Sequence, residues 1–160
     1  FWPGAMRKRE YLFSDIPETV LSGEADAGLI IHETRFTYRA MGLQMVADIG
    51  AMWEEMTGLP VPLGGIMISR HTDSETAARV TRAIRRSIEY ALADPRESME
   101  FIRKNASETD EKVTREHIKL YVNDFSLSLG NEGRQAIEKL FSVAQDKGVT
   151  EPLPGRIFFD

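Results

Sequence analysis

The pattern of apolar and polar positions changes near residue 70. Before it, apolar residues occur in short runs separated by glycine, proline and polar residues; after it, they recur every three or four positions. Short apolar runs are typical of buried β-strands, and the wider spacing is typical of amphipathic helices. The pattern therefore predicts an α/β fold, with a β/α first half followed by a helical second half.

Four segments of the first half have strand-like patterns. The most apolar, residues 27–31, follows turn-forming residues and resembles a buried strand of a parallel sheet. The other predicted strands are residues 9–13, 43–49 and 66–69. Three short helices are predicted between them, at about residues 14–22, 34–41 and 50–57, from their caps, a first-turn proline and closing glycines.

Capping signals and helical periodicity predict four longer helices in the second half. Thr72 and Glu75 have the spacing of a capping box. Asp94 is expected to cap the next helix, with Pro95 in its first turn. The predicted helices are residues 72–93, 94–104, 109–122 and 130–148, followed by a tail rich in proline and glycine.

Composition narrows the possible functions. With 160 residues the chain can bury one ordinary core, and its net charge of −5 gives no support to nucleic acid or an anionic membrane as a partner. The absence of cysteine excludes disulfides and thiolate chemistry, and three isolated histidines make a structural zinc site an unfavourable interpretation. No apolar run is long enough to cross a bilayer, and residues 1–6 lack the pattern of a signal peptide.

His32 is the leading candidate for chemistry. It follows the most apolar predicted strand, and ligands of open α/β sheets bind beyond the carboxyl ends of the strands. Imidazole is well suited to general base catalysis near neutral pH, although a packed histidine is an equal alternative on these grounds. Alternation along a strand should turn Glu33 to the opposite face, where it is expected to cap the turn at Thr34.

The remaining polar candidates have simpler interpretations. His71 and His117 lack partners at the spacing of a metal site or catalytic triad, so both are expected to be structural. Gly64 and Gly65 precede a predicted strand rather than a helix, which excludes a phosphate loop and leaves open a close backbone approach, a hinge or a pocket rim. Four arginines of the first long helix are expected to be solvated or paired with Glu75 and Glu89: Arg79, Arg82, Arg85 and Arg86. Three residues are expected in the core: Met52, Trp53 and Met56.

Several motifs together resemble one enzyme family. They are residues 23–33 (ending Ile-Ile-His-Glu), 35–38 (Arg-Phe-Thr-Tyr), 48–50, 53–54, 57–65 (Thr-Gly-Leu-Pro-Val-Pro-Leu-Gly-Gly) and 121–126 (Tyr-Val-Asn-Asp-Phe-Ser). In this order they resemble the 1,4-dihydroxy-6-naphthoate synthases of the futalosine route to menaquinone, from about residue 11 to about residue 140.

The resemblance implies both a fold and a reaction. The fold would be the C-terminal portion of a two-lobed protein like a type II periplasmic binding protein, with residues 1–65 in the second lobe and residues 66–160 forming a return strand and the helical part of the first. The reaction would convert cyclic dehypoxanthine futalosine to 1,4-dihydroxy-6-naphthoate by proton abstraction and carbon–carbon cleavage in the cytoplasm. His32 would be the base, with no metal or organic cofactor.

The resemblance also bears on partners and alternatives. Because the family's chains are longer, we expect this chain to be inactive without an N-terminal part, and to form a homo-oligomer or to join a separate N-terminal half. A solute-binding module of the same fold, without catalysis, is the first alternative. A chorismate dehydratase is the second, although the Ile-His-Glu motif argues against it.

Overall fold

The structure is a computed structural model that describes residues 4–106, 110–153 and 155–159. Its regular elements are helices of very different lengths. They are α1 (Ile16–Leu21), α2 (Thr34–Thr37), α3 (Ile49–Thr57), α4 (Ser74–Ala93), α5 (Pro95–Asn105), α6 (Glu111–Tyr121), α7 (Asp124–Leu127) and α8 (Gly130–Asp146). None of the helices formed by the described residues is both long and apolar enough to cross a bilayer.

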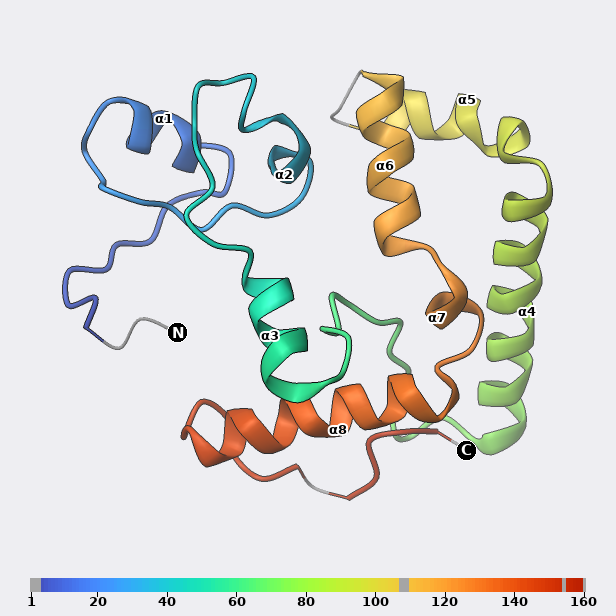
Figure 1. Cartoon of the computed structure of the whole chain (residues 1–160). Coiled ribbons are helices and arrows are strands. Elements are labelled where there is room, and N and C mark those ends of the chain that lie inside the picture. The colour runs from blue at the N-terminus through green and yellow to red at the C-terminus, as the bar shows by residue number, and fades with distance from the viewer. Residues whose placement is uncertain (1–3, 107–109, 154, 160) are drawn as a thin grey trace.

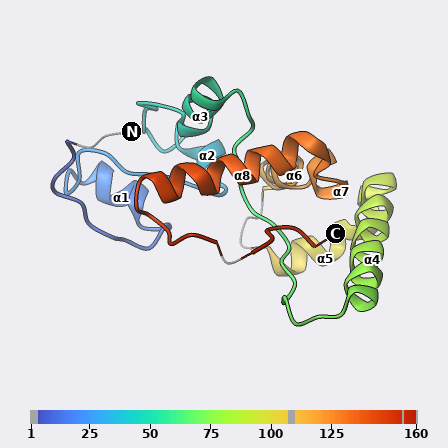
Figure 2. The same cartoon turned by 90° about the horizontal axis from the view of Figure 1, so that it is seen from below.

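The helices form an open arrangement. Figure 1 shows α1, α2 and their long loops on one side, α4 to α7 on the other, and α8 running below. Seen from below in Figure 2, α8 crosses in front of the molecule. Helix α7 packs against α4, and α2 packs against α6, so the two sides of the molecule meet at α2 and α6.

Side-chain caps explain where most of the longer helices begin. Asp48 accepts hydrogen bonds from the backbone N–H groups of Gly50 and Ala51 at the start of α3, and Asp73 accepts one from Thr76 at the start of α4. Asp94 and Asp110 cap α5 and α6 in the same way. Each carboxylate satisfies backbone donors that have no partner within the helix.

The helices predicted from the sequence are confirmed, with local corrections, and the possible start of the third long helix at Thr109 lies outside the described residues. Helix α4 begins one residue after Asp73, so the predicted capping box at Thr72 and Glu75 is wrong by one position. Asp15 precedes α1, but its side chain makes no capping hydrogen bond. The short helix α7, which begins directly after Asn123 and has a capping box formed by Asn123 and Ser126, was not predicted.

The predicted strands are wrong, and with them the α/β class. Residues 9–13, 27–31, 43–49 and 66–69 contain no strand, and the described part of the chain is helical wherever it is regular. The backbone hydrogen bonds of these segments join only near neighbours in sequence. A strand needs a second segment to complete its ladder of hydrogen bonds, and none of the described segments lies alongside another in that way.

Very few side chains form the core. The buried apolar residues are Trp53, Ala77, Met99 and Ala136, which confirms the prediction for Trp53. Met56, also predicted in the core, is 57% exposed. The apolar runs behind the strand predictions are largely exposed too, including Leu29 at 63% and Met67 at 92%. The helices are therefore held together by a few small contacts rather than by one large hydrophobic core.

Candidate functional site

His32 lies in a turn directly before α2, not at the end of a strand. Its φ angle is 56°, the only positive φ among the described residues other than glycine. This left-handed conformation costs most residues about 1–2 kcal/mol, although histidine, asparagine and aspartate adopt it more often than others. Backbone strain of this kind is concentrated at functional sites.

Four aromatic rings form a series of contacts that passes through this turn, from Phe13 to His32, His117 and Tyr121. The ring of His32 lies 5.0 Å from that of Phe13 and 6.2 Å from that of His117, measured between centroids. His117 in turn makes an edge contact with Tyr121 at 4.6 Å. The site thus combines the loop before α1, the turn before α2, and α6.

Glu33 contacts His117 rather than the backbone of α2. The Oε1 atom of Glu33 lies 2.9 Å from Nδ1 of His117, and both side chains are about two-thirds to three-quarters buried, at 32% and 26% exposed. Although Glu33 occupies the N-cap position of α2, its side chain makes no capping hydrogen bond. The expected capping role is therefore wrong.

The expectation that alternation separates His32 from Glu33 also fails. Alternation applies to extended strands, whereas the positive φ of His32 turns the chain within a loop. As a result both side chains approach the same histidine, His117, which the sequence interpretation had treated as an isolated structural residue.

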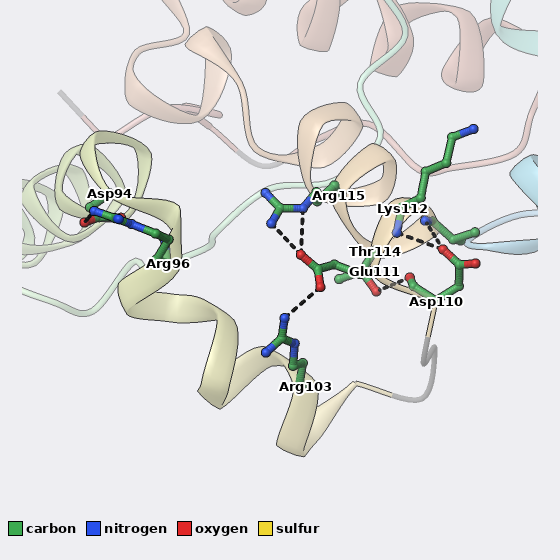
Figure 3. A network of polar contacts seen from close by, with 9 residues as sticks. Asp94, Arg96, Arg103, Asp110, Glu111, Lys112, Thr114 and Arg115 are labelled. Carbon is green, nitrogen blue, oxygen red and sulfur yellow. Dashed lines mark hydrogen bonds and ion pairs between the residues drawn. The ribbon is translucent and has the colours of Figure 1, made fainter.

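The local start of α6 helps to position His117. Glu111 accepts hydrogen bonds from Arg103 of α5 and from Arg115 one turn further along α6, as Figure 3 shows. The hydrogen bond from Arg115, followed by that from Arg103, lowers the pKa of the Glu111 carboxyl below its ordinary value. Together with the cap at Asp110, this network joins the first turn of α6 to α5 through the exposed ion pair of Arg103 and Glu111.

The arrangement favours proton transfer over metal binding. It brings two imidazoles and one carboxylate together in a partly buried place, and a carboxylate on one ring nitrogen of histidine fixes which nitrogen carries the proton. Within the described ranges, no group of three or more histidine, aspartate or glutamate side chains is placed to hold a metal ion.

The other candidates lie apart from these residues. A Cβ atom added to Gly64 or Gly65 would meet nothing within 4 Å, so the suggested close backbone approach is wrong, while a hinge or pocket rim stays a prediction. His71 is exposed. On α4, Arg85 donates to the carbonyl oxygen of Leu127, and no ion pair to Glu75 or Glu89 occurs in the described part of the chain.

Sequence reasoning missed His117 and Tyr121 as members of the site. A signal was present, because residues four positions apart lie on one face of a helix. His117 and Tyr121 have this spacing on α6, so a polar and an aromatic ring share one face. What that face meets could not be known, because Glu33 is 84 residues away in sequence.

Comparison with known proteins gives one consistent family. A family model described as menaquinone biosynthesis matches residues 3–146. A 1,4-dihydroxy-6-naphthoate synthase from Thermus thermophilus is 44% identical over 149 residues, which is 93% of this chain and 55% of that protein. The enzyme of the same name from Streptomyces coelicolor is 42% identical over 141 residues, covering 88% of this chain and 50% of the relative.

One solved structure has a similar backbone. It is the crystal structure of protein AF1704 from Archaeoglobus fulgidus, with a TM-score of 0.80 and 36% sequence identity. The similarity covers 86% of this chain and 52% of that one. This chain therefore spans about half the length of the relatives that it matches.

Proposed function

Because the chain belongs to the menaquinone biosynthesis family, we propose that it is part of a 1,4-dihydroxy-6-naphthoate synthase. The observation that carries this proposal is the identity of 42–44% to two enzymes of that name over about nine-tenths of the chain. The reaction would convert cyclic dehypoxanthine futalosine, a small-molecule substrate, to 1,4-dihydroxy-6-naphthoate. We also propose a cytoplasmic location, as the family resemblance implies.

In this proposal His32 is the general base of a carbon–carbon lyase. The reaction begins when a base removes a proton, and His32 presents a titratable nitrogen in a partly buried, ring-lined site. Its strained backbone supports a functional role, because a residue chosen only for packing would have no need of a positive φ. Gly64 and Gly65, in an open connecting segment, would serve as a hinge between residues 1–65 and 66–160.

We further propose that activity requires polypeptide equivalent to the remaining half of the relatives' length. Several strongly exposed apolar side chains support this, because burying apolar surface against further polypeptide is favourable. Val46, Ile66 and Met67 are 84%, 74% and 92% exposed. The additional polypeptide could belong to a separate chain, and a homo-oligomer would cover part of the same surface.

The test compares the chain alone with the chain supplied with the missing half of a relative, in trans or by fusion. Cyclic dehypoxanthine futalosine is the substrate, and formation of 1,4-dihydroxy-6-naphthoate is measured. We expect turnover only in the combined preparation, and light scattering of the isolated chain should show an oligomer. Turnover by the isolated chain would contradict the requirement for a second half.

A solute-binding role makes a different prediction for the same preparation. The combined protein would bind the substrate but release it unchanged. No product would form, either with His32 or with its replacement. Such a result would reject the synthase proposal.

A further inference from the structure

We infer that Glu33 and His117 form a carboxylate–histidine pair that acts as a second proton-transfer unit beside His32. The inference rests on the proposed function, since it gives His117 a role in the same reaction. It goes beyond that function, because the proposed function gives a role in proton transfer to His32 alone. The pair depends on a contact between two segments 84 residues apart.

The contact determines which nitrogen of His117 carries a proton. An ionised carboxylate can only accept hydrogen bonds, so Glu33 Oε1 at 2.9 Å from Nδ1 requires that Nδ1 carries the hydrogen. In neutral His117 the other nitrogen, Nε2, is then the proton acceptor. The same logic orients the histidine of a serine protease triad, where a carboxylate selects the tautomer and stabilises the imidazolium.

The ring of His117 is also restrained from the other side. Tyr121, one turn along α6, makes an edge contact with it at 4.6 Å, and α6 itself is fixed at its start by Asp110 and Glu111. A ring held by a carboxylate at Nδ1 and by an edge contact with an aromatic side chain has little freedom to rotate. His117 is therefore built as an oriented base and not as a loosely packed surface residue.

The distance to His32 gives the pair its proposed task. Ring centroids 6.2 Å apart allow one small substrate, or one bridging water, to contact both imidazoles. When the C–H bond of the substrate breaks, the proton forms a new N–H bond on His32 and the electron pair stays on the carbon. This pair then forms a double bond as the neighbouring C–C bond breaks, and the C–C electron pair leaves with the departing fragment. Transfer of this proton to Nε2 of His117 restores neutral His32 and leaves an imidazolium beside the Glu33 carboxylate, from which the proton returns to the product fragment.

The first measurement reads the tautomer directly in the chain itself. In ¹⁵N-labelled protein at a pH where the imidazoles are neutral, long-range ¹H–¹⁵N correlations should show His117 protonated on Nδ1. Glu33→Gln should shift His117 toward protonation on Nε2, because the amide can present an N–H donor to Nδ1. The exposed His71 is the internal control, and its tautomer should not change.

A wild-type His117 protonated mainly on Nε2 would overturn the inference. So would a His117 tautomer that is the same in Glu33→Gln as in the wild type. Circular dichroism of each variant shows whether α6 stays helical, and His117→Asn provides a second variant that removes the ring without changing Glu33.

The second measurement is turnover in the combined, active preparation. We expect His117→Asn to lower kcat by roughly 10²-fold, within the range for a positioned acid or base, with KM changed far less. Glu33→Gln should lower kcat in the same direction and alter its pH profile, whereas His71→Asn should change neither. Full activity of His117→Asn would reject the catalytic role.

The two measurements separate this inference from the proposed function. If the wild-type preparation has no synthase activity, the proposed function fails, while the tautomer experiment still decides whether Glu33 orients His117. If activity depends on His32 but not on His117 or Glu33, the function stands and the inference fails.

Discussion

Nδ1 of His117 lies 2.9 Å from Oε1 of Glu33, and this contact joins two parts of the chain that are 84 residues apart in sequence. Through it, α6 meets the turn that holds His32 in its left-handed conformation. The candidate site is thus a meeting point between the loop-rich first half and the helical second half.

Replacing His32 by asparagine should remove the base while keeping approximate size and polarity. Asparagine also tolerates a positive φ, so the turn should persist. In the active preparation we expect turnover to fall roughly 10²–10⁴-fold, the usual effect of removing a positioned base, with substrate binding largely kept. Steady-state kinetics and a binding titration measure the two effects, with His71→Asn as the matched control. An active His32→Asn together with an inactive Glu33→Gln would make the carboxylate the base.

Stability should respond differently to changes at the same position. His32→Gly relieves the left-handed backbone, so the free energy of unfolding should stay within about 1 kcal/mol of the wild type despite the lost ring contacts. His32→Val places a β-branched residue at φ 56° and should lower it by about 1–2 kcal/mol. Urea denaturation compares the two variants. Equal destabilisation by glycine and valine would mean that the ring contacts, and not the backbone, dominate at this position.

Gly28 should be intolerant of even one methyl group. A Cβ atom there would lie 2.3 Å from Cγ2 of Ile16 and 3.2 Å from Cγ2 of Val20, both on α1. Since Cγ2 branches from Cβ in both residues, it can move aside only if χ1 leaves its strongly preferred helical rotamer or the helix itself shifts. We expect Gly28→Ala to lower the free energy of unfolding by about 1–3 kcal/mol. Gly64→Ala, where a Cβ meets nothing within 4 Å, is the control and should leave the melting temperature nearly unchanged.

The open surroundings of Gly64 also make the hinge testable. Because there is room for a larger side chain, Gly64→Val should affect thermal stability only slightly. If residues near Gly64 change conformation when the site closes, valine should restrict that change and reduce turnover more than it reduces the melting temperature. Unchanged turnover would show that this segment is only a connector.

Acid should weaken the start of three helices. The pKa values of Asp73, Asp94 and Glu111 are lowered by hydrogen bonds, chiefly from the Thr76 backbone, the Arg96 side chain and the Arg115 side chain. A carboxyl whose pKa is lower in the folded state stabilises it at pH above the unfolded value, and this contribution is lost as pH falls through the folded pKa. Stability should therefore decline below the ordinary values of 3.8 for aspartate and 4.5 for glutamate.

Glu111 gives this pH dependence a specific test. Glu111→Gln should make the loss of melting temperature in acid shallower, since one linked carboxyl has been removed. Glu100→Gln is the control, because Glu100 is an exposed carboxylate on α5 without an ion pair to a described residue. Identical acid profiles for Glu111→Gln and the wild type would show that the network in Figure 3 does not contribute to stability.

The parts of the fold that could be predicted depend on neighbours in sequence. The beginning of α5 followed from Asp94 and Pro95, and the end of α8 followed from Gly148. The effects of these residues act within one helical turn. The apolar run at residues 27–31 carried no such local information about its partner. Apolar character predicts burial, but a strand also needs a second segment at the right distance, which no single run encodes.

The candidate site divides in the same way. His32 could be identified from its position after an apolar run and from the Ile-His-Glu motif, and its role as a base stays a prediction. The contact of Glu33 with His117 could not be identified, because nothing near either residue in sequence indicates the other. The positive φ of His32 was equally hidden, since histidine is not a residue that usually indicates a turn.

The capping residues of the second half have a consequence for the order of folding. Helices α4 to α7 each begin after a side chain that satisfies their first backbone donors, so residues close in sequence determine where each helix begins. The contact between α2 and α6 instead requires closing a loop of about eighty residues, which is slow and entropically costly. We expect the helical half to acquire its structure early during refolding, and the surroundings of His32 to become ordered last.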